Sequence, residues 1–153
     1  MTWNEIKTQS DADVLMERFG GFHDSCIREV HIWTGYWVCS DFSMQVPKSW
    51  DMKVRLHVQR QWRDPAAIEL LFEDVTRVNL VPSPPDYVSI IYDATLLIRE
   101  GIIHWSPEPN WNPDHSDANS ETWISAKRLR WREVDSWLGE ALQYGPKEIN
   151  NTT

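Results

Sequence analysis

Three side chains that could carry chemistry lie close together near the start of the chain. They are His23, Asp24 and Cys26, within the stretch FGGFHDSCIREV. A histidine oriented by a carboxylate can act as a general base, and a cysteine can act as a nucleophile. Side chains two apart on a strand share a face, so Asp24 and Cys26 would point together while His23 points away. We therefore favour a structural interpretation, in which His23 and Asp24 hydrogen-bond the backbone, over a hydrolase-type site.

This motif stands where a helix is predicted to end and a sheet to begin. Ser10 or Asp11 can accept a hydrogen bond from the free amides of a first helical turn, and we expect a short helix over residues 11–19. Gly20 or Gly21 would end that helix, because glycine enters the left-handed region without a Cβ penalty.

Alternation of apolar and polar residues predicts strands through most of the remaining chain. Strands are expected at residues 27–33, 36–42, 52–59, 68–72, towards 81, 87–98, 102–105 and 123–131. The turns between them are too short for crossover helices, which favours antiparallel pairing. The expected fold class is mainly β (α+β): an antiparallel curled sheet, or a two-layer β-sandwich, of about seven or eight strands.

The C-terminal part of the chain adds three expectations. Apolar residues at helical spacing predict a short C-terminal helix over residues 133–143. Residues 1–145 should form a single globular β-rich domain, and residues 146–153 a disordered tail. The basic cluster Lys127, Arg128, Arg130 and Arg132 is interpreted as a solvated strand face. His57, on the polar side of its strand, is likewise expected in solvent.

The charge balance restricts the class of partner. Fifteen Lys and Arg residues against 23 Asp and Glu residues give a net charge of -8, which argues against nucleic acid and is compatible with a basic protein partner. No apolar run is long enough for a membrane span, and the N-terminus lacks the pattern of a signal peptide. We therefore expect a cytoplasmic protein that binds no membrane, and the sequence carries no signal for its oligomeric state.

The two cysteines, Cys26 and Cys39, are interpreted as buried thiols, with a disulfide as the alternative in an exported protein. No CxxC or HxxxH spacing supports a zinc site. The sequence also lacks a glycine-rich phosphate loop, a GxSxG elbow and an HExxH motif, so no cofactor is expected.

Ten tryptophans are several times the usual share for a chain of this length. Large aromatic side chains are favoured in sheets, so we interpret most of them as core and edge residues. The alternative is a Trp-rich module that stacks on a carbohydrate. It predicts that Trp50, Trp62, Trp105 and Trp111 lie in a row on one sheet face and stay accessible.

A long polar loop is expected between two of the strands, at residues 106–121. It holds Asp114, Asp117, Asn119 and Glu121, whose oxygens are the kind of ligand that calcium prefers. The spacing lacks the glycine and the regularity of an EF-hand loop, so the calcium site is a minor hypothesis.

Four segments together resemble an uncharacterised family of small Gram-positive bacterial proteins that carry an FHDSCI motif. They are FGGFHDSCIREV, QRQW at residues 59–62, IELLFEDV at residues 68–75 and WISAKRLRWR at residues 123–132. The resemblance spans nearly the whole chain and implies no catalytic residues. In size and acidity the chain is also similar to the immunity proteins of bacterial toxin systems.

Three hypotheses for the function follow. The first is a non-enzymatic cytoplasmic interaction protein, such as an immunity protein that masks a basic toxin domain through a complementary acidic surface. The second is the carbohydrate-binding module, and the third is an enzyme that uses His23 and Asp24, with Cys26 as nucleophile.

Overall fold

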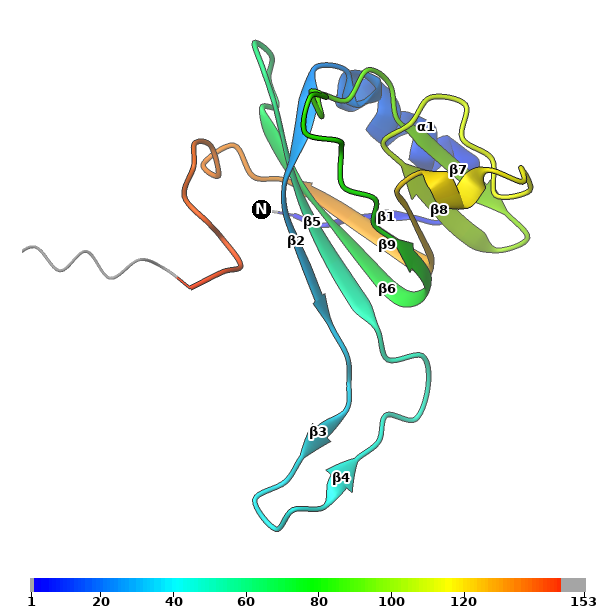
Figure 1. Ribbon diagram of the computed structural model, residues 1–153, viewed down its shortest axis with the longest axis vertical. Coiled ribbons are helices and arrows are strands. Elements are labelled where there is room, and N and C mark those ends of the chain that lie inside the picture. The colour runs from blue at the N-terminus through cyan, green and yellow to red at the C-terminus, as the bar shows by residue number, and fades with distance from the viewer. Residues whose placement is uncertain (1, 147–153) are drawn as a thin grey trace, which may run out of the picture.

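The structure is a computed structural model that describes residues 2–146 (Figure 1). Seven strands form one antiparallel sheet, which confirms the mainly β, antiparallel prediction. They are β1 (Asn4–Ile6), β2 (Ser25–Trp33), β5 (Lys53–Arg60), β6 (Ala67–Asn79), β7 (Thr95–Arg99), β8 (Ile102–Ser106) and β9 (Trp123–Glu133). The disordered tail expected over residues 146–153 falls outside the described residues, apart from Pro146.

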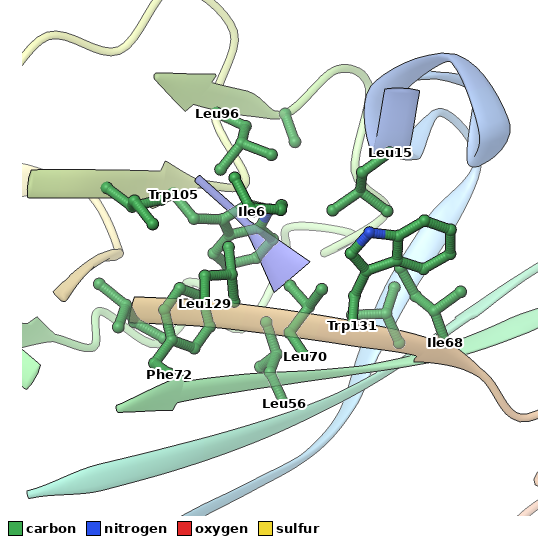
Figure 2. Packing of buried hydrophobic residues seen from close by; sticks show 14 of the residues in the cluster. Ile6, Leu15, Leu56, Ile68, Leu70, Phe72, Leu96, Trp105, Leu129 and Trp131 are labelled. Carbon is green, nitrogen blue, oxygen red and sulfur yellow. The ribbon is translucent and has the colours of Figure 1, made fainter. Parts of the chain in front are cut away.

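The strands lie in the order β2-β5-β6-β9-β8-β7, with β1 also paired to β9. The two neighbours β1 and β8 share one edge of β9: β1 pairs with residues 129–131 and β8 with residues 124–126. The expected architectures were a curled sheet and a two-layer β-sandwich. Hydrogen bonding joins these seven strands into one sheet, as in the first of them. This sheet curls, so that β7 and β8 face β5 and β6 across the core (Figures 1 and 2).

The core lies on the side of the sheet that α1 (Gln9–Arg18) covers. Figure 2 shows Leu15 of α1 and Trp105 of β8 pointing toward Leu70 and Phe72 of β6, with Ile6 between them. All five side chains are buried, because every second residue of each strand faces this side. Such continuous burial of large apolar side chains is the main favourable contribution to folding.

The junction between α1 and the sheet needs both glycines. Gly20 has φ 56° and Gly21 has φ 65°, a region that other residues enter only with strain. The helix begins at Gln9, two residues earlier than expected, because Thr8 caps it and the Asp11 carboxylate accepts the backbone N–H of Thr8 in return. The short 3-10 turn Gly20–Phe22 then places Phe22 in the core.

The C-terminal helix expected over residues 133–143 is not formed, because the chain from residue 134 to 146 consists of turns and bends. Gly139, with φ 86°, interrupts the apolar pattern. Asp135 instead accepts the backbone N–H of Ala66 at 2.9 Å, which turns the chain back over the sheet. The segment lies on the side of the sheet opposite α1 (Figure 1). We call residues 134–146 the C-terminal segment.

The hairpin expected from residues 27–42 is also different. Strand β2 pairs with β5 rather than with the residues that follow it. The intervening residues 34–52 form a long arm that projects from the body (Figure 1), within which β3 (Trp37–Val38) pairs with β4 (Met44–Gln45). The turn at Thr34-Gly35 therefore starts the arm and does not close a hairpin.

Burial separates two tryptophans that look equivalent in the sequence, because Trp105 is fully buried whereas Trp62 is 87% exposed. We expect Trp105→Ala to lower the free energy of unfolding by about 3 to 5 kcal/mol through lost contacts and a cavity. The matched variant Trp62→Ala should change it by less than about 0.5 kcal/mol. Urea denaturation of both variants tests this, and equal effects would contradict the described core.

Candidate functional site

The motif residues lie at the junction between the 3-10 turn and β2. Asp24 has φ 58°, and its backbone N–H donates to the carbonyl of Ile91 at 3.0 Å. The ring Nδ1 of His23 lies 2.7 Å from the carbonyl oxygen of Tyr92, and its Nε2 lies 3.4 Å from Asp24 Oδ2. Both ring nitrogens of His23 therefore have partners: the Asp24 carboxylate and the main-chain carbonyl of Tyr92, in the segment that lies beside the start of β2.

Cys26 is exposed, which corrects the expectation of a buried thiol. Within the described residues it makes no hydrogen bond to His23, and it is not in a disulfide, because Cys39 lies in the arm as a second free thiol. The three motif residues thus form a His-Asp pair beside a separate cysteine, without the contact between base and nucleophile that a Cys-His site requires.

A cleft with a volume of about 350 Å³ opens next to Cys26. Its walls are the start of β2 at Cys26 and Ile27, the loop of residues 81–92, and the turn of residues 107–109. Tyr92, which holds His23 through its carbonyl, contributes to the wall. The sequence motif therefore marks one end of a surface cleft, although its other walls come from segments that no pattern connected with it.

Glu108 lines this cleft and is half-buried. Burial raises its pKa, and the neighbouring carboxyl group of Glu121, which also hydrogen-bonds to it, raises the pKa further. No ion pair reaches either carboxyl group from the described residues. The two carboxyl groups are therefore close neighbours, and neither has a cationic partner among the described residues.

The four tryptophans proposed as a stacking platform do not form an accessible row. Trp105 is fully buried in the core, and Trp111 is buried against Trp123 in a small separate cluster. Trp50 and Trp62 are exposed, but Trp50 lies in the arm and Trp62 in the turn between β5 and β6. The predicted accessible row is therefore wrong, because a high tryptophan count does not reveal which faces of the sheet are covered by other parts of the chain.

In the loop proposed to bind calcium, two of the candidate ligands contact arginine side chains instead. Asp114 pairs with Arg99, and the amide oxygen of Asn119 accepts from Arg77 at 2.9 Å. Among residues 2–146, no group of three or more histidine, cysteine, aspartate or glutamate side chains is arranged to hold a metal ion. Asp117 and Glu121 flank the short 3-10 turn Ala118–Ser120.

A second polar constellation, which the sequence analysis missed, lies on the outer face of the sheet, the face opposite α1. Strand register places Glu29 of β2, His57 of β5, Glu69 of β6 and Arg132 of β9 side by side in one row. His57 and Glu69 are fully buried, so the expectation that His57 is solvated is wrong. The C-terminal segment covers this row.

Charged and polar partners satisfy most of the row. Glu69 binds Arg132 at 2.8 Å and accepts the hydroxyl of Tyr144 at 2.6 Å. Glu29 accepts the backbone N–H groups of Gln143 at 2.7 Å and Tyr144 at 3.1 Å. Each carboxylate thus ties the C-terminal segment to the sheet, which is how a buried charge becomes tolerable.

The His57 ring completes the row. Its Nε2 lies 3.0 Å from the carbonyl oxygen of Trp137, so this nitrogen carries the proton. Its Nδ1 lies 3.5 Å from Glu29 Oε2, which is longer than a good hydrogen bond. Burial lowers the pKa of His57 although Glu29 opposes this, and the imidazole is therefore neutral near pH 7.

The basic cluster of β9 is only in part the solvated face that the sequence indicated. Lys127 and Arg128 are exposed, but Arg130 and Arg132 are half-buried. Arg130 binds the buried Glu73 at 2.7 Å, and Arg128 contacts Glu73 and Asp74. Arg132 also stacks on Trp3, 4.5 Å from its ring centroid. The three arginines of the cluster are therefore paired with acidic side chains of the sheet, whereas Lys127 is exposed beside the Trp50 ring.

Of the two constellations, the buried row lies beneath the C-terminal segment, which its contacts anchor. The cleft beside Cys26 is open to solvent and carries an unpaired acidic group. We therefore take the cleft, together with the exposed arm, as the candidate functional surface, and the buried row as its structural support.

Comparisons with known proteins add no relative: no family model, curated protein or solved structure matches the chain. In the part of the chain that the structure describes, no helix is long and apolar enough to cross a membrane.

The buried row predicts how stability depends on pH. Burial lowers the folded-state pKa of His57 from its ordinary value of 6.5, so the unfolded chain binds a proton more readily than the folded chain. We expect the free energy of unfolding to fall as the pH drops from 7 to 5. His57→Gln should reduce this slope, without abolishing it, because burial also lowers the pKa of His104.

The matched control is His115→Gln, which removes an exposed imidazole and should leave the slope unchanged.

Glu29 should cause a second loss of stability as the pH falls below 4.5, the ordinary pKa of a glutamate side chain. Burial alone would raise its pKa, but the amides of Gln143 and Tyr144 bring it below that value. Thermal melts from pH 7 down to about pH 3 measure both effects, and a His57→Gln slope between pH 7 and 5 equal to that of the wild type would refute the assignment.

Proposed function

We propose that the chain is a non-enzymatic, cytoplasmic interaction protein that binds a basic partner protein. The observation that supports this most directly is the arm, residues 34–52, which carries large apolar side chains away from the body of the protein (Figure 1). Exposed apolar surface of this kind marks sites of protein association.

The exposed side chains follow both sides of the arm. Phe42 at its tip is 90% exposed and Trp37 is 60% exposed. Further exposed apolar residues of the arm are Tyr36, Val38, Met44, Val46 and Trp50. A two-stranded ribbon has no second layer to cover these side chains. Trp50 does contact the body of the protein, because Lys127 Nζ lies 5.1 Å from its ring centroid.

The tip of the arm is nevertheless ordered by local hydrogen bonds. The Asp41 carboxylate accepts the backbone N–H of Ser43 at 2.9 Å and its hydroxyl at 2.6 Å. The Phe42 N–H donates to the carbonyl of Cys39 at 2.9 Å. A pre-formed turn loses less conformational entropy when a partner binds, which favours its use as an anchor.

The basic character of the partner is inferred from the charge of the chain. A net charge of -8 attracts a basic protein over a distance and accelerates its encounter, while the apolar arm supplies buried area at the contact. Similarity in size and acidity to immunity proteins makes a basic toxin domain the first partner to test.

A carbohydrate-binding module is the second candidate. The specific observation in its favour is that Trp37 and Trp50, both in the arm, are more than half exposed. Binding of a sugar, with no protein partner, would favour this candidate over the interaction protein.

The arm proposal predicts that Phe42→Ser, alone and combined with Trp37→Ser, abolishes capture of the basic partner. Both residues are exposed, so the melting temperature should stay within about 2 °C of the wild type. Pull-down from the native host with the tagged chain measures capture, and its readout is one enriched basic protein.

The matched control is Val14→Ser, which removes an exposed apolar side chain from α1. It should leave capture intact. If the arm variants retain the partner, or if the wild-type chain enriches no basic protein, the proposed function is wrong.

A further inference from the structure

The cleft beside Cys26 arises where a chain segment departs from the edge of the sheet. Ser25 of β2 forms an antiparallel bridge with Ile91, whose N–H donates to the Ser25 carbonyl at 2.8 Å. Beyond this bridge, Cys26 and Ile27 face Ser89 and Ile90 across the cleft without pairing. The pairing between β2 and the loop of residues 81–92 is therefore limited to the bridge at Ser25, and the two segments separate after it.

Strand β2 is the terminal strand of the sheet, so its outer edge has no partner strand in the described chain after Ser25. Unpaired main-chain N–H and C=O groups of such an edge accept an added strand readily. The space between β2 and the loop of residues 81–92 is where an added strand would continue the ladder.

The walls of the cleft define the chemistry of that strand. Tyr87 and Tyr92 present aromatic rings, and Ile27, Val81 and Ile90 present aliphatic side chains. No lysine or arginine lines the cleft. Its charged side chain is Glu108, whose carboxyl group sits against that of Glu121 without a cation.

We propose that this cleft binds an extended basic segment of the partner protein, which pairs with the edge of β2 and places an arginine or lysine side chain against Glu108. The inference rests on the proposed function and assigns its recognition site. A cation there would pair with the Glu108 carboxyl group, which no lysine or arginine of the cleft reaches, and the tyrosine rings provide faces on which a guanidinium stacks.

The test uses a defined probe, the peptide acetyl-Val-Thr-Arg-Thr-Val-amide, added to the full chain labelled with ¹⁵N. We expect saturable shifts of backbone amides confined to residues 26–29, residues 83–91 and Glu108. Replacement of the arginine by glutamate in the peptide should abolish the shifts. N-methylation of the valine amides should abolish them too, because it removes the donors needed for strand pairing.

Glu108→Gln should weaken binding of the arginine peptide about tenfold, which is the scale of one charge-assisted hydrogen bond. The matched control Glu17→Gln removes an exposed carboxylate from α1 and should leave the affinity unchanged. Free arginine at the same concentration should bind more weakly than the peptide, because it cannot pair along the strand.

Four results would overturn the inference. They are the absence of saturable shifts at millimolar peptide, equal binding of the glutamate peptide, shifts confined to the arm, and free arginine binding as tightly as the peptide. The outcome is separable from that of the proposed function. Arm-dependent capture of a basic protein whose affinity is unaffected by Glu108→Gln would refute the cleft and leave the interaction function standing.

Discussion

Glu69 lies at the centre of the outer face, where it binds Arg132 of the next strand and the hydroxyl of Tyr144. A fully buried carboxylate is tolerated only with such partners, so these contacts must form together when the chain folds. Because Tyr144 belongs to the C-terminal segment, the same interaction holds that segment over His57. The sheet is therefore covered on both sides, by apolar packing under α1 and by paired charges under the C-terminal segment.

With both faces covered, binding surface remains at the two ends of β2. The cleft borders its start at Cys26, and the arm begins after Trp33. A strand of nine residues separates these ends by about 30 Å. A partner that touches both must be a folded domain with a protruding segment, because a short peptide does not span that distance and fill the cleft as well.

Period-2 alternation in β5 identified correctly which side chains share a face, and Val54 and Leu56 do face the core. It did not reveal that His57, on the polar face, is buried too, because the cover over His57 comes from Trp137, 80 residues later. The apolar spacing of residues 133–143 favoured a helix, but the contact of Asp135 with Ala66 prevailed over that local preference. The cleft was beyond prediction for the same reason, since Cys26 and Glu108 meet only through the topology.

The opposite edge of the sheet has a different character. At β7, the side chain of Gln9 accepts the backbone N–H of Ile98 at 3.1 Å and approaches the carbonyl of Leu96 at 3.5 Å, so an amide side chain stands in for a missing strand. On β2, a bulge at Arg28 disturbs the register. Edge-to-edge stacking of copies into fibrils needs long, regular edges, and the bulge in β2 and the Gln9 contacts at β7 make these two edges irregular. The regular stretch of open edge is therefore short, and it lies at the start of β2 beside the cleft.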